Sequence, residues 1–257
     1  MENKSTTPSS LSDSPSDEIH SRPAVLITGG SAGIGLATAC RFAANGYNVL
    51  ICGREQARLD LALEKIQAME DGPCTLIAVR CDLAEPGAAQ ALIDVAIERL
   101  GKIDVLVNNA GVAPLSPLDE TSDEVFENTI QVNVRSVFYA TRDVWKHMKE
   151  QGSGVVVNIS SLAAVDPFPG FSLYGATKAW VDLMTTALVS EGSEHGIRVY
   201  SVRPGAVETD LLRGLFPDFP ADQCVTPAEV AEKVWECVSQ PDSHASGQHF
   251  PVTKQTS

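Results

Sequence analysis

An apolar run that passes directly into a glycine-rich turn constrains the fold of this chain more than any other feature. Ala24–Thr28 has the composition of a buried strand, and the turn TGGSAGIG, residues 28–35, follows without a break. Residues 36–45 then have a helical pattern that ends at Gly46. A strand, a glycine turn and a helix in this order predict the first unit of a nucleotide-binding α/β fold, although a glycine turn without a ligand is an alternative.

Three glycines of this turn, Gly29, Gly33 and Gly35, have the properties that a dinucleotide diphosphate requires. They carry no Cβ that would block the approach of the backbone, and they tolerate a positive φ. Because they open a helix, their amides are also directed at the place where an anion binds. We therefore predict that this turn binds the diphosphate of a nucleotide cofactor.

The second strand, predicted at residues 48–52, bears on the choice between NAD and NADP. It ends in Gly53 and Arg54, with no acidic residue at the position that meets the adenosine ribose. An arginine there suits the 2′-phosphate of NADP, because a guanidinium binds phosphate oxygens in a bidentate manner, and Ser31 can add a hydroxyl. The sequence thus predicts NADP, unless Arg54 is solvated or pairs with a nearby carboxylate such as Glu55.

Further elements of the α/β pattern follow along the chain. We expect strands at residues 75–80, 104–108 and 154–160, and helices at residues 55–69, 86–100 and 128–149. Asp82 follows the third strand, where its carboxylate can accept the adenine amino group or cap the next helix. Residues 109–111 follow the fourth strand and suit either a crossing point under a cofactor or a plain turn. Asn133 lies among apolar residues of the last helix, where a buried amide needs partners.

Residues 161–178 bring a hydroxyl, a phenol and an ammonium together. Tyr174 and Lys178 are four residues apart, so on a helix they lie one turn apart. The ammonium is expected to lower the pKa of the phenol, which makes Tyr174 a general acid or base, and Ser161 can hydrogen-bond the same substrate oxygen. The alternative is an ordinary helix surface. The expected buried stripe of this helix consists of Leu173, Ala176, Trp180, Leu183 and Ala187.

Composition and charge exclude several classes of protein. The chain of 257 residues is 44% hydrophobic and has a formal net charge of −14 without a long basic run, which argues against nucleic acid and anionic membranes as partners. No apolar run is long enough to span a membrane, and the N-terminus has no signal-peptide core. Six cysteines without metal-ligand spacing indicate reduced thiols and no metal site. We expect a soluble cytoplasmic protein.

The first residues differ in composition from the rest of the chain. Residues 1–22 are crowded with Ser, Thr, Pro and acidic side chains and contain almost no large apolar ones. Such a segment buries too little surface to offset the entropy of ordering it. We expect a disordered tail at residues 1–22 and a single domain at residues 23–257.

In its motifs and their order, the chain resembles the short-chain dehydrogenase/reductase family. The matching motifs are TGGSAGIG, Cys81-Asp82-Leu83, NNAG at residues 108–111, Asn133, Ser161, YGATK at residues 174–178, and Arg203-Pro204-Gly205 with Thr209. The resemblance implies a catalytic tetrad of Asn133, Ser161, Tyr174 and Lys178. It also implies cofactor contacts from Gly29, Ser31, Gly33, Ile34, Gly35, Arg54, Asp82, Leu83, Asn109, Ala110, Gly111, Tyr174, Lys178, Pro204, Gly205, Val207 and Thr209.

The resemblance implies an α/β fold class: a single doubly wound Rossmann fold with a seven-stranded parallel sheet, strand order 3-2-1-4-5-6-7, and helices on both faces. It implies reversible hydride transfer between NADP and a small-molecule carbonyl or secondary alcohol. Residues 52–66 and 226–241 are similar to the NADP-dependent 3-hydroxy acid dehydrogenases, which implies a small 3-hydroxy acid as substrate. A 3-oxoacyl thioester reductase and a non-catalytic NADP-binding regulator are the alternatives.

Two predicted helices carry more apolar residues than one buried face requires. They start near Asn128 and Tyr174, and Trp145, Trp180 and Met184 are candidates for a contact between subunits. A helix that is apolar on more than one face needs a second partner to cover it. We expect a homo-oligomer, and the family resemblance implies a homodimer or a homotetramer.

Overall fold

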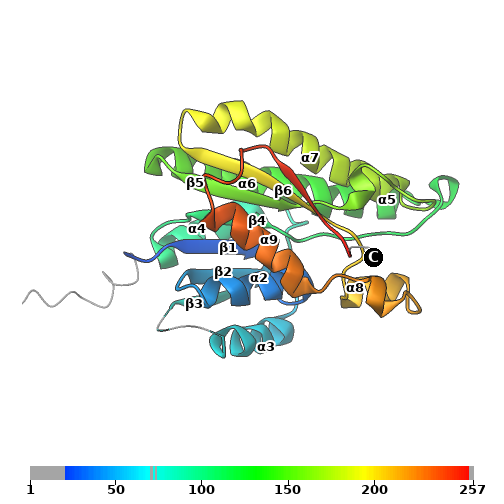
Figure 1. Cartoon of the computed structure of the whole chain (residues 1–257), viewed down its shortest axis with the longest axis horizontal. Helices are drawn as coiled ribbons and strands as arrows, with labels where there is room; N and C mark the ends of the chain where they lie inside the picture. Colours follow the sequence, from blue (N-terminus) through cyan, green and yellow to red (C-terminus); the bar gives the residue numbers. More distant parts are fainter. Residues whose placement is uncertain (1–20, 70–71, 73, 255–257) are drawn as a thin grey trace, which may run out of the picture.

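The computed structural model describes residues 21–69, 72 and 74–254, so the tail predicted at residues 1–22 lies almost entirely outside the described part. Within that part, seven strands form one parallel sheet in the order β3-β2-β1-β4-β5-β6-β7 (Figure 1). The strands are β1 (Ala24–Thr28), β2 (Asn48–Gly53), β3 (Leu76–Arg80), β4 (Val105–Asn108), β5 (Gly154–Ile159), β6 (Ile197–Pro204) and β7 (His249–Val252). The predicted fold class and strand order are confirmed.

Helices cover both faces of the sheet. One face packs against α2 (Gly33–Ala43), α3 (Gln56–Gln67) and α9 (Pro227–Ser239). The other face packs against α4 (Ala88–Leu100), α6 (Ser136–Gln151) and α7 (Ser172–Ser193). Two shorter helices, α5 (Asp123–Ile130) and α8 (Asp210–Leu215), lie on the side of the molecule where the strands end (Figure 1).

Alternating side chains of the strands fill two hydrophobic layers, one under each set of helices. Val25 and Ile27 of β1 belong to the layer that contains Phe42 of α2, whereas Leu26 belongs to the layer that contains Ile93 of α4. Successive residues of a strand point to opposite faces, so a sheet covered on both sides needs apolar residues at every position. This is why the strands appear in the sequence as unbroken apolar runs.

The sheet reverses its direction of growth between β1 and β4. The chain runs from β1 outward to β3, then returns to add β4 on the other side of β1. The loops that follow β1 and β4 therefore diverge, and the crevice between them is where ligands bind in this class of fold. Asn109 joins the two loops, because its Nδ2 donates to the carbonyl oxygens of Thr28 at 2.9 Å and Gly29 at 3.0 Å.

Three local predictions are wrong. The helix expected at residues 128–149 begins earlier and contains a π-helical turn, Gln131–Arg135, between α5 and α6. Pro86 lies before α4 rather than in its first turn, since Gly87, with a φ of 79°, precedes the helix. Asp82 does not cap α4; instead its Oδ1 accepts a hydrogen bond of 3.0 Å from the amide of Ala84.

The buried face of α7 is not the one that the apolar pattern predicted. Lys178, Val181 and Thr185 are buried, whereas Leu183 is 70% exposed. Of the predicted stripe, Ala176 and Ala187 are exposed and the remaining members are half-buried. Polar side chains occupy the inner face because they contribute to the site and to a buried network described below, so the apolar pattern marked an outer face instead.

Within the described part of the chain, each helix is too short or too polar to cross a lipid bilayer.

Candidate active site

A cavity of about 980 Å³ opens at the carboxyl ends of β1, β4, β5 and β6. The parallel strands end at one edge of the sheet, so the residues that follow them in the chain meet there. Most of the residues predicted to bind the cofactor line this cavity: Gly29, Gly33, Ile34, Asn109, Ala110, Gly111, Tyr174, Lys178, Pro204, Gly205, Val207 and Thr209. Ser161 lines it as well, so residues that are far apart in the sequence come together at this cavity.

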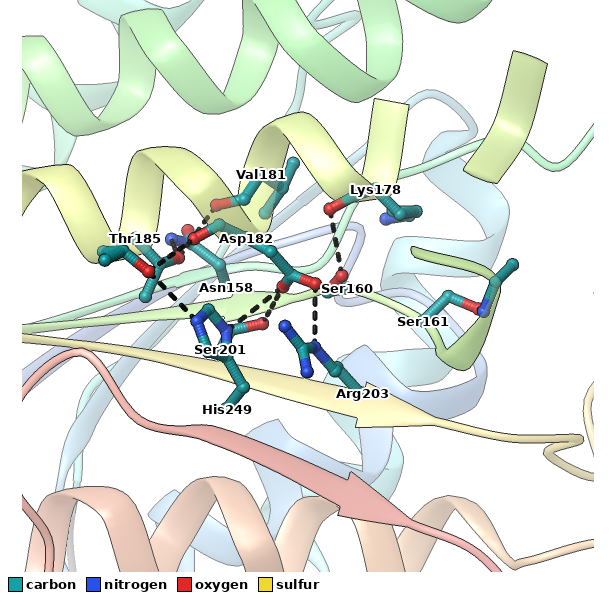
Figure 2. Close-up of polar contacts among 12 residues, drawn as sticks. Asn158, Ser160, Ser161, Lys178, Val181, Asp182, Thr185, Ser201, Arg203 and His249 are labelled. Atoms are coloured by element: carbon teal, nitrogen blue, oxygen red, sulfur yellow. Dashed lines mark hydrogen bonds and ion pairs between the residues drawn. The ribbon is translucent and has the colours of Figure 1, made fainter. Parts of the chain in front are cut away.

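Two adjacent serines follow β5, and the structure distinguishes them. The Ser160 hydroxyl is buried and donates a 3.2 Å hydrogen bond to the carbonyl oxygen of Lys178 (Figure 2). The Ser161 hydroxyl accepts a 3.1 Å hydrogen bond from the amide of Ala163 and remains at the cavity. Because an accepted bond leaves the hydroxyl proton available, Ser161 can donate to a substrate oxygen. Ser160 instead anchors α7 to the end of the strand.

Tyr174 lies in the first turn of α7, with its ring against Phe171 at a centroid distance of 5.0 Å. Burial raises the pKa of its phenol, and a hydrogen bond with the Ser161 side chain opposes this rise. The predicted lowering of this pKa by Lys178 is therefore wrong, because the net shift is upward. Two effects act on the phenolate: burial removes its hydration, and the Lys178 ammonium, 5.8 Å from the ring centroid, attracts it. The loss of hydration is the larger effect. The tyrosine is held as a neutral proton donor.

Lys178 is buried one turn further along α7. Its Nζ donates a 2.8 Å hydrogen bond to the carbonyl oxygen of Ile159. Burial lowers the pKa of the ammonium to about 8, and the negative charge of Asp182 opposes that decrease. A pKa near 8 leaves most of the lysine protonated at pH 7, so a positive charge is present beside the tyrosine.

Asn133 lies in the π-helical turn and is fully buried. Its Oδ1 accepts from the amide of Val112 at 2.8 Å, while its Nδ2 donates to the carbonyl oxygen of Val112 at 2.8 Å and to the Thr177 hydroxyl at 3.1 Å. A Cβ placed on Gly111 would lie 3.4 Å from both Asn133 Oδ1 and Lys178 Nζ. The amide thus joins the loop after β4 to α7 beside the lysine.

A buried polar network lies behind Lys178. Figure 2 shows the carboxylate of Asp182, one turn after the lysine, directed at side chains of β6 and β7. It accepts from the Ser201 hydroxyl at 2.5 Å and from Arg203 Nε at 2.8 Å, and His249 Nδ1 lies 3.4 Å away. Burial lowers the pKa of His249, which favours the neutral ring. The network ties α7 to the far side of the sheet and places one carboxylate near the lysine.

The glycine turn is shaped as a cradle for a dinucleotide. Gly29 has a φ of 65°, and a Cβ there would lie 3.0 Å from Ala110 Cα. A Cβ on Gly35 would lie 2.3 Å from the carbonyl oxygen of Gly29, so α2 packs against the turn only because this residue has no side chain. The first amides of an α-helix have no carbonyl partner within the helix, so those of α2 can bind an anion placed at this turn. These residues fit the diphosphate of a nicotinamide cofactor.

The end of β2 adjoins a second cavity of about 620 Å³, which Ser31 lines together with Arg58. A Cβ on Gly53 would lie 3.1 Å from Ser31 Oγ, so the strand end and the glycine turn are in contact. Arg54 is exposed and makes no ion pair with the described residues, because Glu55 pairs with Arg58 and the nearby Asp60 accepts from Gln56. The guanidinium of Arg54 is therefore available.

Some predicted residues lie outside both cavities, and some lining residues were not predicted. Gly35, Arg54, Asp82 and Leu83 line neither cavity. Arg58, which lines both, was missed although it lies only four residues after Arg54. Its place beside the glycine turn becomes visible only once α3 is packed on the sheet. The aromatic residues Phe168, Phe171, Phe216 and Phe219 of the large cavity were missed as well.

This arrangement can hold a carbonyl oxygen between two hydroxyl donors and supply a proton to it. Ser161 and Tyr174 both line the cavity, and Lys178 lies behind the tyrosine. The described residues contain no group of three His, Cys, Asp or Glu side chains placed to hold a metal ion. The chemistry open to these side chains is proton transfer and orientation of a substrate oxygen.

Comparison with known proteins agrees with this geometry. Residues 23–219 match the family described as short chain dehydrogenase. The chain is 36% identical over 195 residues to 3beta-hydroxysteroid dehydrogenase 1 of Eggerthella lenta, covering 76% of this chain and 74% of that protein. It is 36% identical over 243 residues to 2-(R)-hydroxypropyl-CoM dehydrogenase of Xanthobacter autotrophicus, covering 86% and 93% of the two chains.

A solved structure of similar extent is 3-ketoacyl-(acyl-carrier-protein) reductase from Brucella melitensis complexed with NADH. It aligns with a TM-score of 0.81 and 32% sequence identity, covering 90% of this chain and 96% of that one. The family match and the aligned structure both cover most of this chain. The chain belongs to the short-chain dehydrogenase/reductase family and is an oxidoreductase of alcohols and ketones.

Proposed function

We propose that this protein is an NADP-dependent enzyme that interconverts a ketone and a secondary alcohol, with Asn133, Ser161, Tyr174 and Lys178 as its catalytic residues. The observation that carries the proposal is the meeting of Ser161, Tyr174 and Lys178 at one cavity with the glycine turn. We also propose that residues 23–257 form a single domain around this site, since the seven described strands form one sheet and four of them end at the cavity.

In the direction of reduction, the chain orients the substrate and supplies the proton. A bound nicotinamide supplies the hydride. Ser161 and Tyr174 donate hydrogen bonds to the carbonyl oxygen, and the phenol then gives its proton to that oxygen. Lys178, protonated at neutral pH, stabilises the phenolate that remains and holds the cofactor ribose. Asn133 joins the loop after β4 to α7 beside Lys178, and we propose that it also holds a water through which the phenol regains its proton.

The choice of NADP rests on the side chains at the end of β2. Gly53 brings neither charge nor bulk to the place where the adenosine ribose is expected, whereas a carboxylate there would repel a 2′-phosphate. The Ser31 hydroxyl is in contact with this strand end, and the exposed guanidinium of Arg54 has no carboxylate partner among the described residues. Arg58 lines the adjoining cavity and provides a second positive charge. These features support NADP, although a solved relative holds NADH.

The double substitution Gly53→Asp with Arg54→Ala is expected to reverse this preference. The new carboxylate would repel the 2′-phosphate and accept a hydrogen bond from the ribose 2′-hydroxyl of NAD. The ratio of kcat/KM for NADPH over NADH should fall by about 100-fold or more, since charge-assisted contacts are worth up to ~3 kcal/mol each. Fluorescence titration of NADPH and NADH provides a readout that does not depend on turnover.

The control for that experiment is the single substitution Arg54→Ala. Arg54→Ala alone keeps the space at Gly53 and should weaken NADPH binding without improving NADH binding. A wild-type kcat/KM that favours NADH would contradict the proposed role of this turn.

The alternative of a regulator that binds NADP without chemistry predicts a different result. Such a protein has no need of a phenol, a buried ammonium and a serine hydroxyl at one cavity. A screen that follows NADPH absorbance with simple ketones, 3-oxo esters and oxoacyl thioesters separates the two. Steady oxidation of NADPH with at least one ketone supports the enzyme, and tight binding without oxidation supports the regulator.

Two narrower substrate predictions come from the sequence resemblance: a small 3-hydroxy acid and a 3-oxoacyl thioester. The relatives bear names that refer to a 3beta-hydroxysteroid, to 2-(R)-hydroxypropyl-CoM and to 3-ketoacyl-(acyl-carrier-protein). They share hydride transfer at a secondary alcohol or its ketone, which supports the proposed reaction without selecting a substrate. The residues that line the cavity bear on that selection.

We further propose that the protein is a homodimer or homotetramer built on the outer faces of α6 and α7. Phe138 and Leu183 are 45% and 70% exposed on these helices, and Trp145 and Trp180 are half-buried. Covering such side chains releases about 25 cal/mol for each Å² removed from water. Light scattering at micromolar concentration should give at least twice the chain mass, and Leu183→Glu should lower it. A monomeric mass for the wild type would contradict the proposal.

A further inference from the structure

The part of the cavity next to Tyr174 is lined by aromatic side chains. Phe171 packs on Tyr174, Phe168 lies 4.3 Å from Phe171 between ring centroids, and Phe216 lies 5.8 Å from Phe168. We call these three phenylalanines the aromatic cluster. They come from the loop before α7 and the end of α8, so two separate segments close around the same space. Leu212 and Leu215 of α8 extend this apolar surface.

Two large apolar side chains of this lining are open to solvent. Phe168 is 46% exposed and Leu211 is 52% exposed. Exposed apolar surface around a concave site is typical of a place that a ligand covers. Gly170 fixes the loop that carries Phe168, since its carbonyl oxygen accepts a 3.0 Å hydrogen bond from the amide of Ser116 and its φ is 88°. The apolar entrance therefore belongs to a defined loop conformation.

Positive charge is scarce where the carboxylate of a hydroxy acid would need it. Among the described residues that line the cavity, the cations are Lys178, which is buried behind Tyr174, and Arg58, which lies at the glycine turn. Arg213 of α8 is already bound to Glu208, and it donates to the carbonyl oxygens of Pro217 and Phe219. A carboxylate placed against the aromatic cluster would lose its hydration without gaining a cation.

Negative charge, by contrast, is present at this cavity. Asp166 lines it, is exposed, and forms no ion pair with the described residues. Asp210 at the start of α8 lines it too. Both carboxylates repel an anion that enters this part of the cavity. This repulsion disfavours the binding of a polyanionic thioester and of a free hydroxy acid alike.

We infer that the site takes neutral, bulky, apolar ketones and secondary alcohols, such as fused-ring compounds, in preference to small hydroxy acids or charged thioesters. The aromatic cluster and the leucines of α8 bury the apolar body of the substrate, while Ser161 and Tyr174 bind its one polar oxygen. This assignment rests on the proposed function for the reaction itself. It adds to that function the class of substrate that the cavity selects. We propose this class in place of the small 3-hydroxy acid expected from the sequence.

The first test compares substrates that differ in a single property. Methyl 3-hydroxyhexanoate and 3-hydroxyhexanoate share a skeleton and differ in charge, and we expect the ester to have a kcat/KM at least about tenfold higher with NADP. In the series butanone, cyclohexanone and 2-decalone, kcat/KM with NADPH should rise with apolar size. An acid oxidised as well as its ester, or a flat series of ketones, would overturn the inference.

Two variants tie these preferences to the side chains. Phe168→Ala should lower kcat/KM for 2-decalone several times more than for butanone, because only the larger ketone reaches the aromatic cluster. The control is Phe126→Ala, which removes the same side chain at the same 46% exposure from a position outside the cavity and should leave the ratio unchanged. Asp166→Asn should narrow the ratio between ester and acid. Unchanged ratios in both cavity variants would contradict the assignment.

A binding measurement distinguishes two outcomes: that the cavity assignment is wrong, and that the proposed reaction is wrong. Calorimetry with the NADP-saturated protein should show tighter binding of 2-decalol than of 3-hydroxyhexanoate. If the protein binds these alcohols in that order but oxidises none, the proposed reaction fails and the cavity assignment stands. If it oxidises alcohols but binds the acid more tightly, the assignment fails and the reaction stands.

Discussion

Tyr174→Phe lowers kcat by about 100-fold or more, since positioned proton donors contribute factors of this size. In the proposed mechanism the phenol gives its proton to the substrate oxygen, and phenylalanine has no proton to give in its place. Phenylalanine keeps the ring contact with Phe171, whose centroid lies 5.0 Å away, so the fold and the cofactor site stay intact. The measurement is steady-state oxidation of NADPH, with cofactor binding followed by fluorescence in parallel.

A matched substitution shows whether the effect belongs to the proton. Tyr139→Phe removes a phenol that is 37% exposed on α6 and lies outside the cavity, and it should leave kcat unchanged. If Tyr174→Phe retained more than about a tenth of wild-type activity, the barrier would have changed by less than ~1.4 kcal/mol. So small a change would contradict the role of this tyrosine as proton donor.

Asp182→Asn is expected to destabilise the protein by about 3 kcal/mol, because it leaves a mostly buried guanidinium without its counter-charge. Arg203 Nε lies 2.8 Å from the carboxylate, and the two side chains are 21% and 7% exposed. The Ser201 hydroxyl donates to the same carboxylate, so an asparagine cannot satisfy all three contacts. Denaturant unfolding of wild type and variant measures the difference.

Another buried carboxylate on the neighbouring helix provides the control. Asp143 of α6 is equally inaccessible, but its partner Arg142 is 55% exposed, and its second oxygen has no partner among the described residues. Asp143→Asn should therefore cost less than ~1 kcal/mol, as a solvent-exposed ion pair does. Equal losses in the two variants would show that burial of the carboxylate, and not the paired arginine, determines stability.

The same change at Asp182 has a consequence for pH dependence. Its charge raises the pKa of Lys178 and so opposes the decrease to about 8 that burial causes. Without that charge the pKa falls further, and the ammonium beside Tyr174 loses its proton at lower pH. The alkaline decline of kcat should shift to lower pH in Asp182→Asn, and a purely structural role for Asp182 would not move it.

The fold could be predicted from the sequence more completely than the local geometry could. Unbroken apolar runs separated by amphipathic helices are what a parallel sheet covered on both faces requires, and the glycine turn marks the first strand. These patterns depend on nearest neighbours in the chain, so they are readable without coordinates. The site residues that follow strand ends, such as Asn109 and Ser161, could be placed for the same reason.

Features that depend on tertiary packing could not be predicted from the sequence. The apolar stripe expected on α7 marked its outer face, because Lys178, Asp182 and Thr185 face inward to partners on distant strands. The pKa of Tyr174 was predicted with the wrong sign, because the degree of burial is a property of the assembled fold. The aromatic cluster could not be predicted for a similar reason: Phe216 is distant in the chain from Phe168 and Phe171, and it meets them only when α8 packs beside the loop before α7.

The π-helical turn at Gln131–Arg135 makes the position of Asn133 sensitive to the length of the segment between α5 and α6. A π turn accommodates one residue more than the α-helical turn it replaces, and such turns recur at functional sites. Each residue of an α-helix turns the chain by about 100°, so loss of that residue would rotate Asn133 away from Val112 and Thr177. Deleting one residue of this turn should therefore displace the amide from the loop after β4, although the apolar pattern of the flanking helices would be kept.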